Sequence, residues 1–195
     1  MTINPILFNT EMVRAILDGR KGATRRIVKG FIPDDAVWGY IAFTHKVYIS
    51  CRGTFADGDG EKFFKLPCEP GDILYVRETW KKAPNGYYYY EDWQRNDIAD
   101  ITKWKPSIHM PKEAARIWLK VMNVRVERLQ EITEVQAQAE GCNSGLLTGA
   151  CTARGQFEDL WNSTVKKSDI DRYGWDANLY VWVISFERCE KPEGV

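Results

Sequence analysis

The sequence lacks the residues of a disulfide framework or a metal centre. Its five cysteines are odd in number, widely scattered and never in a Cys-x-x-Cys pair. The two histidines, His45 and His109, stand at no metal-ligand spacing from a second ligand type. Because disulfide-rich domains and zinc sites need closely spaced ligands, we expect a reduced, cytosolic chain with no metal and no cofactor.

Long apolar runs are also missing. No run approaches the roughly 20 residues that span a bilayer. The first residues, Met1 to Phe8, are apolar but carry no basic leader before the polar Asn9, Thr10 and Glu11. A secretory signal needs such a leader. The sequence therefore predicts a cytoplasmic protein with no signal peptide and no contact with a membrane.

Several known kinds of catalytic site are absent too. The sequence has no phosphate-cradling glycine loop, no Ser-His-Asp set and no carboxylate cluster for two metals. The charges of the 27 basic and 27 acidic side chains cancel, which disfavours a long nucleic-acid duplex as ligand.

The length of 195 residues suits one domain, and no linker divides it. We expect a single domain over residues 1–195.

The hydrophobic pattern predicts an α+β fold, with short helices between mostly antiparallel strands around a small barrel. Strands are expected at 73–80, 117–129 and 179–186, hairpins at 37–51 and 80–90, and helices at 11–18, after Thr133 and around Phe157. The glycine- and aspartate-rich stretch from Gly53 to Lys65 predicts a surface loop.

Positive charge is concentrated between Gly19 and Arg26. This segment is expected to form a loop that holds Lys21 and Thr24 among arginines, and the chain is expected to turn into a strand from Arg25 to Val28. An ammonium surrounded by guanidinium groups loses its proton more easily, and a neutral lysine can activate a hydroxyl. The segment therefore predicts a site for an anionic ligand, with Lys21 and Thr24 as reactive groups. The alternative is a solvated basic turn.

Glu140 departs from the usual charge pattern of helices. It stands in the last turn of the helix that begins after Thr133. A carboxylate there faces the negative end of the helix dipole, at a typical cost of about 0.3 to 1 kcal/mol. Such departures tend to mark functional sites, so Glu140 is a candidate acid or base. The alternative is an exposed helix end.

Two further segments combine charged and aromatic residues. In Arg77-Glu78-Thr79-Trp80 the first two side chains point to opposite faces of a strand, so Glu78 is either buried, with the basic loop as its partner, or at a strand end that leaves the core. Trp104, Ser107 and His109 lie in a segment that interleaves basic, aromatic and polar groups. That mixture suits a nucleobase stacked beside bound phosphate, and equally suits a rigid connection with Trp104 in the core.

The order of these motifs resembles the ASCH domain family. The pattern Gly19-x-Lys21-x-x-x-x-Arg26 after a short helix is similar to its signature. The phage and prophage branch of the family is resembled further by Pro70-Gly71-Asp72, Val76 to Trp80, Pro106 to Pro111 and Trp175 to Asn178. The resemblance covers nearly the whole chain. It implies a PUA-like β-barrel associated with RNA, with insertions near 31–65 and 81–105, in the cytoplasm of a bacterial host.

The resemblance also implies an activity. In the small amidohydrolases of this family, a lysine, a threonine and a glutamate are the proposed catalytic set. Lys21 and Thr24 match the first two, and Glu140 aligns with the third. The chain is thus expected to be a nucleoside- or RNA-directed hydrolase, removing an acyl group from a modified cytosine such as 4-acetylcytidine. Cleavage of RNA is the other chemistry in the family.

The remaining site residues are expected to bind the substrate. Arg26 or a backbone amide would hold the developing oxyanion. Trp80 or Trp104 would stack the base, with Glu78, Ser107 and His109 beside it. The alternatives are a module that binds RNA or a modified base without turnover, with Lys21, Arg25 and Arg26 on phosphate, and a phage assembly or host-interaction protein.

Overall fold

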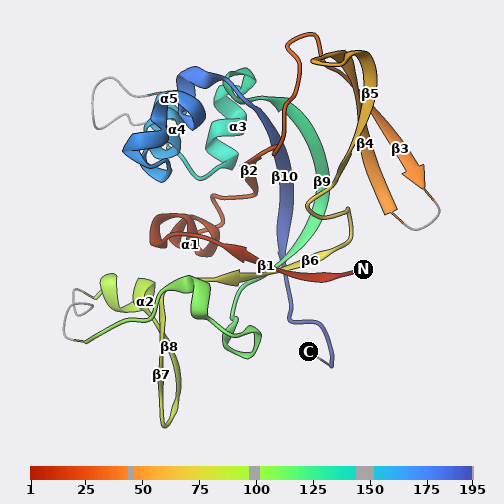
Figure 1. Cartoon of the computed structure of the whole chain (residues 1–195). Coiled ribbons are helices and arrows are strands. Elements are labelled where there is room, and N and C mark those ends of the chain that lie inside the picture. Colours follow the sequence, from red (N-terminus) through yellow and green to blue (C-terminus); the bar gives the residue numbers. More distant parts are fainter. Residues whose placement is uncertain (44–45, 97–101, 144–151, 195) are drawn as a thin grey trace.

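A five-stranded sheet forms the centre of the computed structural model, which describes residues 1–43, 46–96, 102–143 and 152–194 (Figure 1). Its strands lie in the order β1-β6-β9-β10-β2. They are β1 (Ile3–Leu7), β2 (Ala23–Ile27), β6 (Ile73–Arg77), β9 (Trp118–Arg128) and β10 (Tyr180–Cys189). β1 and β6 are parallel, and the other neighbours are antiparallel. The edge strands are therefore β1 and β2.

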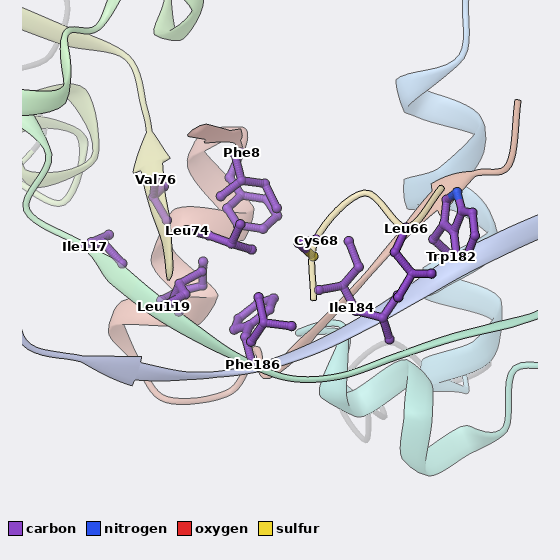
Figure 2. Close-up of a cluster of buried hydrophobic side chains, with 14 of the residues drawn as sticks. Phe8, Leu66, Cys68, Leu74, Val76, Ile117, Leu119, Trp182, Ile184 and Phe186 are labelled. Carbon is purple, nitrogen blue, oxygen red and sulfur yellow. The ribbon is translucent and has the colours of Figure 1, made fainter. Parts of the chain in front are cut away.

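β10 is buried on both faces, as a strand covered on each side must be. Trp182, Ile184 and Phe186 point into the first hydrophobic cluster, where Figure 2 shows them with Leu66 and Phe8. The alternate residues, of which Val181 and Val183 are the most buried, pack into a second cluster beneath the helices. The sheet thus separates two cores.

The first core is closed by helix α1 (Thr10–Leu17). Asn9 caps it by accepting a 2.8 Å hydrogen bond from the Met12 backbone N–H, and Val13 and Ile16 face the core. The chain leaves the helix through Gly19, at φ +73°, a backbone conformation that favours glycine. The predicted helix over 11–18 is confirmed within one residue at each end.

The second core packs against α3 (Glu134–Ala139) and α4 (Ala153–Thr164). α5 (Ile170–Tyr173) groups with them on the same side of the sheet in Figure 1. α3 begins with the predicted capping box, in which Thr133 and Gln136 bond each other's backbone N–H. Short 3-10 helices span Ser107–His109, Lys112–Ala114, Leu129–Glu131, Lys167–Asp169 and Trp175–Ala177. The second core is thus capped by short helices with local sequence signals.

Two smaller sheets extend from opposite ends of the molecule in Figure 1. One contains β3 (Val37–Phe43), β4 (Lys46–Phe55) and β5 (Gly58–Lys65); the other is the hairpin of β7 (Trp80–Ala83) and β8 (Gly86–Tyr89), followed by α2 (Tyr90–Gln94). Both predicted hairpins are confirmed. The tip of the first, with His45, lies outside the described residues.

The predicted surface loop from Gly53 to Lys65 is wrong. This stretch forms the end of β4 and all of β5, paired in register from Tyr48↔Lys65 to Phe55↔Gly58. Cross-strand contacts such as the 2.9 Å bond from Arg52 to Glu61 stabilise the pairing. Glycine and aspartate weaken a strand locally, but pairing along its whole length outweighs them.

The molecule has a mixed α+β fold, built mostly of strands in open sheets, with short helices. That part of the prediction is confirmed. Among the described strands no hydrogen-bonded ladder joins β1 to β2, so a closed barrel is not found. No helix in the described ranges is long and apolar enough to cross a membrane.

Candidate functional site

A pocket of about 410 Å³ lies between the two edge strands of the central sheet. Arg26 of β2 reaches across to β1 and donates a 3.0 Å hydrogen bond to the Leu7 carbonyl oxygen. The pocket is lined by β1, α1, β2, Glu140 and α4, through Pro5, Ile6, Leu7, Asn9, Met12, Thr24, Arg25, Arg26, Glu140, Phe157, Leu160, Trp161 and Thr164. Pockets of about 300 to 1,000 Å³ hold small molecules in proteins, and the volume of this one lies in that range.

A buried ion pair stands behind this pocket. The Lys21 Nζ lies 2.6 Å from the Glu140 Oε2, and the two side chains are 0% and 2% exposed. The same Nζ donates to the Glu140 carbonyl oxygen at 2.9 Å. The backbones form an isolated antiparallel bridge at these residues, and the Gly22 N–H donates to the Ala139 carbonyl. These contacts connect the end of α3 to the segment before β2.

Glu140 has a second cationic partner. The Arg25 Nη1 lies 3.1 Å from the Glu140 Oε1, and the Arg25 Nη2 contacts Glu127 of β9. Glu127 also pairs with Arg125. Lys21 and Arg25 are therefore buried and neutralised by carboxylates, and Ala23–Ile27 is a strand. The strand expected from Arg25 to Val28 is confirmed within two residues at its start and one at its end. The alternative of a solvated basic turn is wrong, because Lys21 and Arg25 turn inward to acids from distant parts of the chain.

Burial changes the proton affinity of these cations. It lowers the pKa of the Lys21 ammonium, because a charge is costly to keep away from water; the Glu140 carboxylate opposes this shift and Arg26 adds to it. Burial also lowers the pKa of Arg26. The predicted direction for Lys21 is confirmed, but desolvation is the main cause and neighbouring positive charge the smaller one.

Thr24 lies on the same pocket as Glu140. It stands opposite Ile184 in the pairing of β2 with β10 and is 1% exposed. No hydrogen bond joins its hydroxyl to Lys21 or Glu140 in the described structure. The fold thus brings Lys21 and Glu140 into direct contact, and Thr24 and Glu140 both line the pocket.

The part of the pocket lining that α4 supplies is mostly apolar, and sequence reasoning missed it. α4 contributes Phe157, Leu160 and Trp161, and Thr164 completes the face. The Arg25 guanidinium lies 5.6 Å from the centre of the Phe157 ring. The spacing of these four positions, three and four residues apart, is the signal of one helix face. It indicates an amphipathic helix without showing that its face lines a pocket.

Glu78 is placed elsewhere, and its predicted partner is wrong. Both its carboxylate oxygens accept 2.9 Å hydrogen bonds from Arg116, not from the basic segment. Arg116 also bonds Asp92. Burial raises the pKa of Glu78, and Arg116 opposes this shift. Glu78 does not line the pocket described above; it joins the Arg116 contacts near β8 and α2.

The other predicted binding residues also lie outside the lining of this pocket. Trp80 is 5% exposed and packs in a third hydrophobic cluster, with the Lys105 Nζ 5.2 Å from its ring centre. Trp104 makes edge contacts with Tyr90 and Trp93 at 5.5 and 5.3 Å between ring centres. Ser107 and His109 are the ends of a 3-10 helix.

The charged side chains of the described ranges do not gather as metal ligands. Within those ranges, no group of three or more His, Cys, Asp or Glu side chains could hold a metal ion. The polar side chains that line the pocket are those of Asn9, Thr24, Arg25, Arg26, Glu140 and Thr164, and Lys21 is paired with Glu140.

Comparisons with known proteins add little to this geometry. No family model matches the chain, and no curated protein matches it. The crystal structure of hypothetical protein PH0355 is similar over 97% of this chain and 100% of that one, with 13% identity and a TM-score of 0.42. A similarity at this level says nothing about activity.

Proposed function

We propose that this chain is a hydrolase that removes the acyl group from a modified cytosine such as 4-acetylcytidine, within a PUA-like fold of the ASCH type. The observation that carries the proposal is the buried Lys21–Glu140 pair next to a pocket that also contains Thr24. A nucleophile, a base of lowered pKa and a carboxylate are the groups that acyl transfer needs.

Each group has one task in the reaction. Lys21, in its neutral form, accepts the proton of the Thr24 hydroxyl, whose oxygen attacks the acyl carbonyl carbon. Arg26 stabilises the oxyanion, since its two hydrogen bonds to carbonyl oxygens occupy only part of its five donors. Lys21 passes the proton taken from Thr24 to Glu140 across the ion pair, and Glu140 gives it to the leaving amine as the C–N bond breaks. Water then hydrolyses the threonine ester and releases acetate.

The pocket supports a small substrate. The side chains of Phe157, Leu160 and Trp161 offer an apolar wall for a flat base. The alternative of a binding module with Lys21 and Arg25 on phosphate is less well supported, because both cations already contact carboxylates. Of the cations expected to hold phosphate, Arg26 alone lacks an acidic hydrogen-bond partner among the described residues.

Release of acetate from 4-acetylcytidine tests the proposal. We expect Thr24→Val to lower kcat by about a thousandfold or more, because it removes the nucleophile and keeps the shape of the side chain. Thr24→Ser keeps a hydroxyl and retains measurable turnover. Thr54→Val, which removes an exposed hydroxyl from β4, serves as the matched control and stays fully active.

Two outcomes would argue against this function. Wild-type protein that releases no acetate would reject the amidohydrolase and leave the binding module or RNA cleavage to be tested. A Thr24→Val variant as active as the wild type would reject Thr24 as the nucleophile. Circular dichroism on each variant separates lost chemistry from lost folding.

A further inference from the structure

A second pocket adjoins the first at Arg26. It has a volume of about 420 Å³ and lies where the end of β2 meets the end of β5. Its lining consists of Arg26, Ile27, Val28, Lys29, Phe63, Phe64, Lys65, Pro67 and Trp182. Arg26 lines both pockets. The two pockets are therefore neighbours on either side of Arg26.

This second pocket has a positive charge of its own. Three of its lining residues, Arg26, Lys29 and Lys65, are cationic, and none is acidic. Neither lysine forms an ion pair with any described residue, and both are exposed. This contrasts with Lys21 and Arg25, whose charges are balanced by carboxylates. On a chain with zero net charge, two exposed lysines with no ion pair among the described residues, next to Arg26, favour an anion.

The floor of the second pocket is rigid. The Val28 N–H donates to the Tyr180 carbonyl oxygen at 3.0 Å, so the chain stays bound to β10 just before Lys29. On the other side, Leu66 packs in the first core with Trp182, and Figure 2 shows the two side chains together. The backbones that carry Lys29 and Lys65 are thus held in place next to the pocket.

We propose that the second pocket binds a phosphate group joined to the sugar of the substrate, so that a phosphorylated acylcytidine binds in preference to the free nucleoside. This inference rests on the proposed function, which puts the base in the first pocket. The sugar then lies near Arg26, and Lys29 and Lys65 contact the phosphate. An extended chain advances about 3.3 Å per residue, so the backbone of Lys29 lies roughly 10 Å beyond that of Arg26.

Binding measurements test this inference without catalysis. The ligands are cytidine, cytidine 5′-monophosphate and a short cytidine-rich RNA. We expect the phosphorylated ligands to bind more tightly than cytidine, and Lys29→Ala with Lys65→Ala to weaken them about tenfold, since each exposed charge contact contributes up to about 1 kcal/mol. Cytidine binding stays unchanged. Lys103→Ala with Lys112→Ala removes the same charge from outside this pocket and serves as the control.

The outcomes separate this inference from the proposed function. Equal affinity for cytidine and its monophosphate, or equal effects of the two double variants, would overturn the phosphate site whether or not acetate is released. Failure of acetate release with phosphate-dependent binding intact would reject the hydrolase alone. Tighter binding of RNA than of the monophosphate, with a steeper decrease in salt, identifies a polynucleotide as the source of the phosphate.

Discussion

Glu140 holds two buried cations at once, and the two are not equivalent. Lys21 has no other carboxylate partner among the described residues, whereas Arg25 also contacts Glu127. Removal of one member of a buried ion pair leaves an unbalanced charge, which costs more than the pair itself contributes. The stability of the site therefore depends more on Glu140 than on either cation.

This asymmetry predicts how two variants differ in stability. Glu140→Gln leaves the Lys21 ammonium without a counterion and should lower the free energy of unfolding by about 3 to 5 kcal/mol. Lys21→Met leaves Glu140 paired with Arg25 and should cost less, about 1 to 3 kcal/mol. Urea unfolding measures both. Glu61→Gln, at the exposed pair with Arg52, is the control and should change stability by less than about 1 kcal/mol.

A larger loss for Lys21→Met than for Glu140→Gln would contradict this account of the pair. It would mean that the lysine stem, which also places its Nζ 5.5 Å from the centre of the Phe8 ring, contributes more through packing than Glu140 does through charge.

The contact between α3 and α1 depends on a residue without a side chain. Gly141 follows α3 at φ +95°, in the left-handed region. A Cβ atom added there would lie 2.7 Å from the Cβ of Ala15 on α1 and 3.4 Å from the Cβ of Lys21. Glycine thus allows the end of α3 to come close enough for Glu140 to reach Lys21.

Gly141→Ala should therefore be unusually destabilising. We expect a loss of about 2 to 5 kcal/mol, made of backbone strain and overpacking. Gly58→Ala is the matched control, because Gly58 also has positive φ, +107°, but a Cβ there meets nothing within 4 Å. Thermal unfolding is measured for both variants. Both carry the cost of backbone strain, and only Gly141→Ala carries the cost of the close contact with Ala15. Equal losses would contradict a role for the close contact with Ala15.

Local signals predicted the elements better than they predicted the site. The Thr133 capping box and the Gly86 turn are short-range chemistry and were found where expected. Lys21 and Glu140 are 119 positions apart in sequence. The sequence pattern could therefore identify each residue as a candidate, but it could not predict that the two are in contact. The Gly53–Lys65 strands were missed because their stability comes from pairing. The role of α4 in lining the pocket was missed, because amphipathic spacing predicts a buried helix face but not which part of the fold that face contacts.

The first and the second hydrophobic cluster each contain a buried cysteine thiol. Burial, with the nearby negative charges of Asp72 and Glu69, raises the pKa of Cys68 to about 12. Burial, with Glu140, raises the pKa of Cys142 to about 11. Cys68 belongs to the first cluster and Cys142 to the second. Ionising either thiol in the folded state would place a charge in an apolar core.

The folded protein should consequently lose stability at alkaline pH. An unfolded thiol has its ordinary pKa of about 9, whereas the folded thiols have pKa values of about 12 and about 11. The folded state then binds more protons than the unfolded state. The contribution of each thiol to the free energy of unfolding is therefore complete below about pH 9 and is lost as the pH rises, by at most about 1.4 kcal/mol per pH unit.

Urea unfolding at a series of pH values should show Cys68→Ala losing less stability than the wild type above pH 9. Cys189→Ala, at a half-buried position, should follow the wild type more closely. Parallel curves for wild type and Cys68→Ala would mean that the Cys68 thiol does not couple folding to pH.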